Sequence, residues 1–298
     1  MQQTTLIKAG PSKARFRFNP ASQSSQQLLG HTAAHLALAC VGILYFLPFF
    51  WLISTSLKEL GQIFRFPPVW IPNPIRWQNY PEALSYFPFV RQLLNTLFVC
   101  LTSVVLSLSS SVLVAYSFSR LRWVGRDILF VLMLSTMMLP YQVTMIPLFV
   151  IYRHLGWVNT FLPLILPNLF GNAFFIFMLR QFYLGLPKEL DEAAIIDGCS
   201  PLGVLWYVVL PLSKPALATI GLFQFLGSWN DFLGPLIYLN DPQKYTLSLG
   251  IQVFISTNGV QWAWMMAATT VLTVPVVILF FFTQRTFIQG IALTGLKA

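Results

Sequence analysis

Long apolar stretches alternate with short polar segments along most of the chain. Several stretches reach about 20 residues, the length that a helix needs to cross a bilayer. They predict about six transmembrane helices, at His35–Ser56, Leu93–Phe118, from Ile128 onward, Phe161–Tyr183, Ala216–Leu239 and Trp262–Phe282. Pro140 and Pro147 interrupt the third stretch, so we expect that helix to be kinked or broken there.

The composition supports an all-α, polytopic membrane protein. Of the 298 residues, 56% are hydrophobic and 9% are charged, against about 25% charged residues in ordinary soluble domains. The apolar stretches are continuous rather than alternating, which excludes an outer-membrane barrel. Cys40, Cys100 and Cys199 form no paired motif, and the histidines form no ligand pattern. We therefore expect neither a disulfide nor a metal site.

Three regions follow from this pattern. Residues 1–30 carry four basic side chains and no acidic ones, which predicts a flexible, basic cytoplasmic tail. Residues 31–285 hold the six predicted spans, with a polar loop at residues 186–212 between the fourth and the fifth. Residues 286–298 are expected to form a C-terminal tail in the cytoplasm.

The basic residues are distributed unevenly between the two sides of the membrane. With the N-terminus inside, the inner segments hold twelve of the 18 lysines and arginines, and the outer segments hold six. Because loops rich in Lys and Arg stay in the cytoplasm, both termini and the loop at 186–212 are predicted to be cytoplasmic. This topology also explains the net charge of +9 without a nucleic-acid partner.

The loop between the fourth and fifth spans has the pattern of two short helices. It holds four of the nine acidic residues of the chain: Glu189, Asp191, Glu192 and Asp197. Pro187 suits the first position of a helix, whose dipole favours acidic residues in the opening turns. Gly198 suits a left-handed C-terminal cap. Ser200 and Pro201 suit the N-cap and first position of a second helix, which we expect to end at Pro211.

The second of these helices, Pro201–Leu212, is strongly apolar but too short to cross a bilayer. We expect it to lie at the membrane surface, where Trp206 and Tyr207 suit the interface. The loop is thus predicted to hold an acidic helix in the cytoplasm, close to the inner surface of the membrane.

The spacing of residues in this loop resembles the EAA loop of ABC-importer permeases. The motif reads Glu192-Ala193-Ala194, three residues, Gly198, nine residues, Val208, one residue and Leu210-Pro211. The family usually has Ile at the position of Val208. Three further segments are similar to the MalG-like branch, the permeases of carbohydrate importers: Ser228–Phe232, Pro67–Trp70 and a tail with Gln289, Gly290 and Gly295. The resemblance covers roughly residues 30–298.

The resemblance implies an importer built from several chains in the bacterial inner membrane. Two homologous permeases line the pathway, a dimer of ABC ATPase subunits drives it, and an extracytoplasmic solute-binding protein delivers a sugar. The EAA helix inserts into a cleft of the ATPase and passes on its ATP-driven closure. The residues that the resemblance assigns to this coupling are Glu189, Asp191, Glu192, Ala193, Ala194, Asp197, Gly198 and Pro211.

The sequence contains no site for the nucleotide itself. A phosphate-binding loop of the form GxxxxGK[ST] needs a Gly-Lys pair, which does not occur. An HExxH motif and a serine nucleophile with its base are likewise missing from the sequence. We therefore expect a non-enzymatic subunit without a cofactor, with ATP and Mg bound by the partner ATPase.

Polar side chains within the spans are candidates for the substrate pathway, because polar groups are costly in lipid and usually face a cavity. They are Asn95, Asn172, Gln224, Trp229, Asn230 and Asp231. Amides, a carboxylate and aromatic rings together suit a sugar, and Phe225 adds another ring. Two structural alternatives stay open: Asn230 and Asp231 could cap a local break of the helix, and Asn168 with Asn172 could hold helices together.

The main prediction is a permease subunit of an ATP-driven importer of sugars or oligosaccharides. The same architecture could import glycerol phosphate or a polyol glycoside, although a phosphate would favour basic residues in the path, and none is obvious at mid-span. A self-sufficient secondary transporter would need a coupling-ion site and often has internal symmetry. An intramembrane enzyme or receptor is the third alternative, and no catalytic constellation supports it. The sequence leaves the identity of the sugar open.

Overall fold

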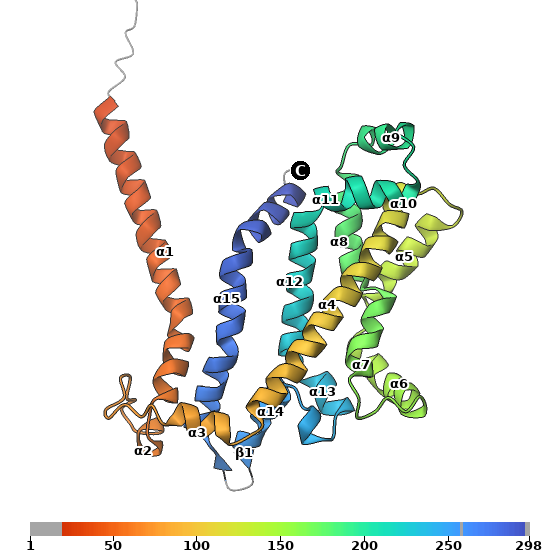
Figure 1. The fold of residues 1–298 in the computed structure, drawn as a ribbon. Helices are drawn as coiled ribbons and strands as arrows, with labels where there is room; N and C mark the ends of the chain where they lie inside the picture. Colours follow the sequence, from red (N-terminus) through yellow and green to blue (C-terminus); the bar gives the residue numbers. More distant parts are fainter. Residues whose placement is uncertain (1–19, 257–258, 296–298) are drawn as a thin grey trace, which may run out of the picture. The chain divides into compact units, whose positions relative to one another are not determined.

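The computed structural model describes residues 20–256 and 259–295, and Figure 1 shows their helices. The chain separates into two compact units, residues 1–51 and 52–298, which are described separately. Within the described residues, the first unit consists of most of helix α1 (Pro20–Ser56). The apolar part of this helix, Gly30–Ser56, is long enough to cross a membrane.

Helix α1 begins inside the segment that the sequence predicts to be a flexible tail. Its first residue is Pro20, so residues 20–29 are helical. Proline is favoured at the first position of a helix, and the residues that follow contain neither Pro nor Gly before Gly30. Nothing local therefore prevents the helix from starting early. Residues 1–19 of the predicted tail lie outside the described residues.

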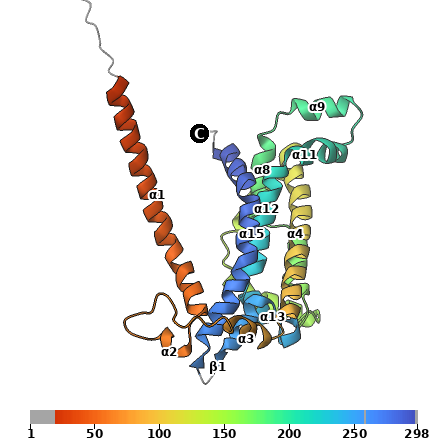
Figure 2. The ribbon, with the colours of Figure 1, turned by 60° about the vertical axis from the view of Figure 1, so that its left-hand side comes forward.

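Four helices form the body of the second unit: α4 (Phe89–Arg120), α8 (Ala173–Leu184), α12 (Lys214–Asn230) and α15 (Trp262–Gly295). Helix α4 packs against α8 and α12, and α12 packs against α15. Figures 1 and 2 both place the short helix α9 (Glu189–Ile196) at one end of this bundle, and strand β1 (Ile255–Ser256) at the other. We refer to these as the α9 end and the hairpin end.

Two clusters of buried apolar side chains hold the bundle together, one near each end. The first joins the last turns of α4 to α8, α12 and the segment that follows α9. The second joins the first turns of α4 to α3 (Asn79–Ser85), α14 (Leu247–Gly250), η4 (Ile251–Phe254) and α15. Between them, Ser103, Ser107 and Ser111 lie buried on one face of α4. Small side chains at this spacing allow neighbouring helices to approach closely.

Length and composition allow four helices of the described chain to cross a membrane, and up to six if each bent helix pair forms one span. The first pair is α5 (Arg126–Thr136) with α6 (Tyr141–His154), bent by 97°. This confirms the break expected at Pro140, whereas Pro147 lies inside α6 and does not interrupt it. The second pair is Pro201–Leu212 with α12, bent by 80°.

The fourth and fifth predicted spans are also interrupted. The fourth consists of α7 (Leu162–Ile165), η1 (Leu166–Phe170) and α8. Gly171 adopts a φ of +86° between η1 and α8, a conformation that glycine adopts at no steric cost. The fifth was predicted to run to Leu239, but α12 ends at Asn230 and a separate helix α13 (Leu233–Tyr238) follows.

Helix α15 continues well past Phe282, the predicted end of the last span. It reaches Gly295, so residues 286–295 of the predicted C-terminal tail are helical. Apolar residues recur after Arg285 and no proline follows, so no strong breaker ends the helix earlier. Residues 296–298 lie outside the described part of the chain.

The hairpin end is built from short elements. They include α2 (Leu60–Ile63), α3, η3 (Pro242–Lys244), α14, η4, β1 and β2 (Gly259–Val260). The two strands pair antiparallel, with Ile255 opposite Val260. They are the only strands within residues 20–256 and 259–295, so the described fold is all-α apart from this hairpin.

Candidate functional site

Helix α9 carries the acidic residues of the loop at its N-terminal end. Lys188 is its N-cap, and the backbone N–H of Asp191 donates to the Lys188 carbonyl at 3.0 Å. Pro187 therefore precedes the cap and does not occupy the first helical position that the sequence predicted. The missing N–H of proline has no intrahelical partner at either place, so both positions accept it. Acidic side chains in the first turn interact favourably with the helix dipole.

The C-terminal end of α9 has the cap that the sequence predicts. Gly198 has a φ of +89°, and its N–H donates to the Ile195 carbonyl at 3.0 Å. The N–H of Cys199 donates to the Ala194 carbonyl at 2.9 Å. These two bonds define a Schellman motif, which fixes the direction in which the chain leaves the helix.

The second helix of the loop begins as predicted but does not end as predicted. In α10 (Pro201–Val204), the Ser200 hydroxyl accepts from the Gly203 N–H at 3.2 Å. A π-helical turn, η2 (Leu205–Val209), and α11 (Leu210–Leu212) follow, and the chain bends only at Ser213. Pro211 thus lies inside the helix. Proline clashes with the preceding turn of an α-helix, and a wider π-turn just before it relieves that crowding.

The predicted coupling residues divide between two faces of the loop. Asp191 is half-buried and Ala194 is buried against the bundle, whereas the other predicted members of α9 and its cap are exposed: Glu189, Glu192, Ala193, Asp197 and Gly198. Ile195 is also exposed, and the Ile196 side chain is 85% exposed. Sequence reasoning missed these two isoleucines, although their position beside the motif was a usable signal. The outer face of α9 therefore combines carboxylates with apolar side chains.

Arg120, the last residue of α4, attaches this loop to the bundle. Its side chain is 4% exposed and its Nη1 lies 3.3 Å from Oδ2 of Asp191, which is 16% exposed. Its Nη2 donates to the Leu186 carbonyl at 3.0 Å. One arginine thus holds both the start of the loop and the first turn of α9. In the sequence, Arg120 was visible only as one of the inner basic residues.

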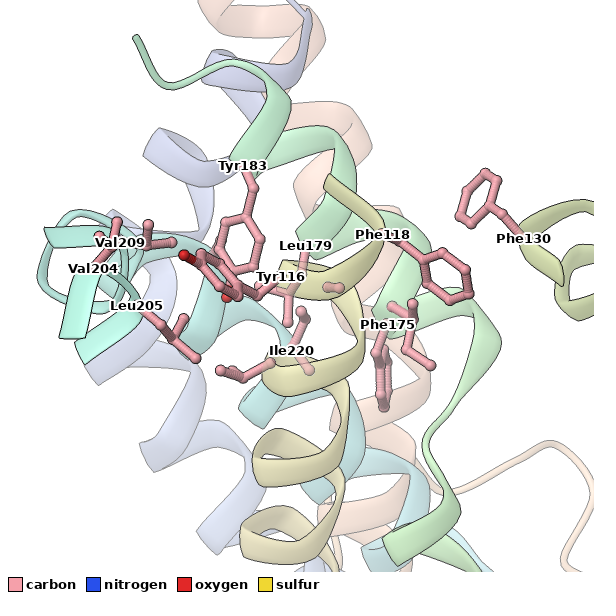
Figure 3. Close-up of a cluster of buried hydrophobic side chains, with 14 of the residues drawn as sticks. Tyr116, Phe118, Phe130, Phe175, Leu179, Tyr183, Val204, Leu205, Val209 and Ile220 are labelled. Atoms are coloured by element: carbon pink, nitrogen blue, oxygen red, sulfur yellow. The ribbon is translucent and has the colours of Figure 1, made fainter. Parts of the chain in front are cut away.

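Tyr116, one turn earlier on α4, holds the second helix of the loop. Its hydroxyl donates to the Pro201 carbonyl at 2.8 Å. Figure 3 shows its ring among the side chains of Leu179, Tyr183, Val204, Leu205, Val209 and Ile220. The apolar face of α10 and η2 is therefore packed against α4, α8 and α12. Trp206 and Tyr207 are exposed on the other face, as expected for a helix at a membrane surface.

Two of the predicted pathway residues make contacts within this chain: Asn95 near the start of α4 and Trp229 near the end of α12. Asn95 is buried, and its Nδ2 donates to the carbonyls of Gln243 and Tyr245 at 2.9 and 3.0 Å. Trp229 is buried and stacks on Phe225 with ring centroids 5.4 Å apart. These two side chains therefore hold the hairpin end together within this chain.

The remaining pathway residues cap or brace helices. Asn172 accepts from the Phe174 N–H at 3.0 Å as the N-cap of α8. Gln224 donates to Ser228 on the next turn of α12, at 3.0 Å. Asn230 is exposed and donates to the Leu226 carbonyl of its own helix at 2.9 Å. Asp231 accepts from the Gly234 N–H at 3.0 Å, which supports its interpretation as the cap of a local break.

A cavity of about 340 Å³ at the breaks of the third to fifth spans contains Asp231. Its polar lining consists of Asn168, Asp231 and three tyrosines, Tyr141, Tyr152 and Tyr238. The Tyr238 hydroxyl is buried and makes no hydrogen bond of ordinary geometry with the described residues. None of the lining residues is basic. Sequence reasoning named Asp231 but missed the tyrosines, two of which come from α6 and one from α13.

Comparison with known proteins identifies the family. Residues 107–292, more than half of the chain, match the model of the "binding-protein-dependent transport system inner membrane component". The chain belongs to this family, so it is a multi-pass membrane permease of the inner membrane and a non-enzymatic subunit of an ABC transporter.

Individual relatives cover nearly the whole chain. The arabinooligosaccharides transport system permease protein AraQ of Halalkalibacterium halodurans is 36% identical over 82% of this chain and 86% of its own length. The sn-glycerol-3-phosphate transport system permease protein UgpE of Yersinia pestis is 32% identical over 86% and 94%. A chain in the crystal structure of a bacterial ABC transporter that imports the acidic polysaccharide alginate is 27% identical, with a TM-score of 0.74 over 88% and 98%.

Proposed function

We propose that this chain is a transmembrane permease subunit of an ATP-driven importer of sugars or oligosaccharides that receives its cargo from an extracytoplasmic solute-binding protein. Membership of the binding-protein-dependent family and the sugar-transporting relatives support the class. The observation that carries the proposal is helix α9. It is closed at its C-terminal end by the Schellman motif, attached on one side to α4, and exposed on the other.

The exposed face of α9 binds a partner ABC ATPase, which supplies the energy. ATP and Mg bind to that ATPase, in agreement with the lack of a phosphate-binding loop in this sequence. The partner's polar groups contact the carboxylates of Glu189, Glu192 and Asp197. The Ile196 side chain enters an apolar cleft of the ATPase. The cap at Gly198 keeps α9 short and its exit angle fixed, so a displacement of the partner moves the helix as a unit. The ATPase is a dimer, and each of its subunits binds one permease. A second, homologous permease therefore completes the importer.

The cargo passes the cavity beside Asp231. Phenol, amide and carboxylate groups are hydrogen-bonding partners for sugar hydroxyls, and the tyrosine rings provide apolar platforms. The cavity holds a carboxylate and no basic residue, which favours a neutral sugar over glycerol phosphate. Glycerol phosphate or a polyol glycoside remains the second candidate cargo, because a relative is named as an sn-glycerol-3-phosphate permease.

Both chain termini and the α9 end face the cytoplasm in this proposal, and lipid surrounds the bundle. Twelve of the 18 basic residues belong to the segments that this orientation places inside, in accordance with the positive-inside rule. The bend of 80° between Pro201–Leu212 and α12 agrees with a helix that lies along the inner surface before the chain crosses.

Replacing Gly198 tests the coupling role. Gly198→Leu forces a bulky side chain into a left-handed conformation, which costs roughly 1–2 kcal/mol, although no atom lies within 4 Å of its added Cβ. We expect uptake of the transported sugar to be abolished while membrane insertion persists. Gly125→Leu is the matched control, because Gly125 has a φ of +86° and equally open surroundings in the α4–α5 turn. Normal uptake with Gly198→Leu, or equal loss with both variants, refutes the role of α9.

A further inference from the structure

Helix α4 differs from every other candidate span of the described chain in having neither proline nor glycine. Its 32 residues correspond to a length of about 48 Å at 1.5 Å per residue. The third, fourth and fifth spans are broken, and α15 contains Pro275. A helix without such residues has no built-in kink. Among the spanning segments, α4 is therefore the one best suited to move as a rigid body.

The α9 end of α4 is attached to the coupling loop at three points. Arg120 contacts the Asp191 carboxylate and the Leu186 carbonyl, and Tyr116 contacts the Pro201 carbonyl. Both α4 side chains are buried. The contacts fall before α9, within its first turn, and at the start of α10. A displacement of α9 therefore cannot leave the end of α4 in place without breaking them.

The hairpin end of α4 is also attached at several points, here to a segment about 150 residues away in the sequence. The Asn95 amide donates to the Gln243 and Tyr245 carbonyls. The Thr96 hydroxyl accepts from the Leu247 N–H at 2.9 Å, and the Gln92 amide donates to the Pro242 carbonyl at 3.5 Å. All three α4 side chains are buried. They bind the backbone of η3 and the start of α14, which lead into η4 and the hairpin.

We propose that α4 is the mechanical link between the coupling helix and the opposite side of the membrane, with Arg120 and Asn95 as its positioning residues. The proposal rests on the proposed function, in which α9 moves with an ATPase. A nucleotide-driven movement of α9 reaches the segment Pro242–Phe254 through α4. Because coupling between two sites is reciprocal, a protein that docks at the hairpin end changes the nucleotide affinity of the ATPase through the same contacts.

A spin label on the hairpin end measures this link without knowledge of the cargo. Val253, which is exposed on η4, is replaced by Cys after Cys40 and Cys199 have been changed to Ala, while Cys100 is buried and kept. The permease is purified in nanodiscs together with the ATPase that accompanies it. The probe is the non-hydrolysable nucleotide AMP-PNP with Mg²⁺, and the readout is the change in label mobility.

We expect AMP-PNP to change the mobility of the label, and we expect Arg120→Ala and Asn95→Ala each to reduce that change at least about fivefold. AMP-PNP is added at saturation, and the nucleotide occupancy of the ATPase, measured in parallel, stays complete in every variant. Two matched controls keep the full response. Arg126→Ala removes an arginine whose ion pair is with the neighbouring Asp127. Asn230→Ala removes an amide whose hydrogen bond is to the Leu226 carbonyl of its own helix.

A label that ignores AMP-PNP in the parent complex overturns the proposal, and so does a full response in either α4 variant. If Arg120→Ala does not assemble, the exchange Arg120→Asp with Asp191→Arg takes its place. The exchange is expected to restore assembly and a response within about twofold of the parent. An exchange that assembles without any response contradicts the role of the ion pair. A permease that brings down no ATPase would refute the proposed function instead, so the two failures are distinct.

Discussion

The two ends of α4 are anchored by different chemistry. At the α9 end, a charged pair and a phenol hold the loop, and most of the loop surface is exposed. At the hairpin end, Gln92, Asn95 and Thr96 bind backbone groups and are fully enclosed. One end thus leaves an exposed surface, while the other fixes a folded segment of the same chain.

This difference explains which parts of the molecule could be read from the sequence. The cap at Gly198, the start at Ser200 and the break at Pro140 follow from neighbouring residues, because caps and prolines act within one turn of a helix. The EAA spacing also lies within one short segment. The local structure of the loop between α8 and α12 was therefore predictable, apart from the place of Pro211 inside a helix, which depends on the π-turn before it.

The hairpin end could not be read in the same way. Asn95 was predicted to line the pathway because it is polar and lies in an apolar stretch. Its acceptors are backbone carbonyls about 150 residues away, and a carbonyl belongs to every residue, so no sequence signal marks it. Asp231 shows the same limit: its role as a cap was one of two open interpretations, and the tyrosines that share its cavity come together only in the fold.

The largest effect is expected from Arg120→Ala, which leaves the Asp191 carboxylate without its cation. Removing one member of a largely buried pair costs several kcal/mol, and we expect about 3 kcal/mol because Asp191 keeps some contact with water. Hydrogen exchange of the α9 and α10 amides should rise by more than a hundredfold, while the hairpin end stays unchanged. If amides at the α9 end and at the hairpin end lost protection from exchange equally, the two ends of α4 would not be anchored independently.

Gly250→Ala tests how tightly the hairpin end is packed. A Cβ on Gly250 would overlap with the Oε1 of the buried Gln92 side chain, and crowding of this kind costs about 1–3 kcal/mol. Unfolding by denaturant should show the loss, and Gln92→Ala in the same chain should recover most of it. Failure of the second change to rescue the first would show that Gln92 and Gly250 do not share this space.

A smaller effect is expected from Asn95→Ala, which leaves the Gln243 and Tyr245 carbonyls without their donor. Unsatisfied buried acceptors cost about 1–3 kcal/mol, and we expect a value near the middle of this range, measured by hydrogen exchange of residues 242–250. Asn230→Ala is the control, since that side chain is exposed. Equal stability of the two variants would mean that the hairpin end does not depend on Asn95.

The central claim is that the exposed face of α9 binds an ATPase, and a photo-crosslinker at Ile196 tests it most directly. Ile196 is 85% exposed at the α9 end, and Phe66 is 92% exposed in the loop between α2 and α3. We expect p-benzoyl-phenylalanine at Ile196 in intact cells to form an adduct with an ATPase chain, and the same group at Phe66 to form none. Adducts with the ATPase from Phe66 but not from Ile196 would contradict the account.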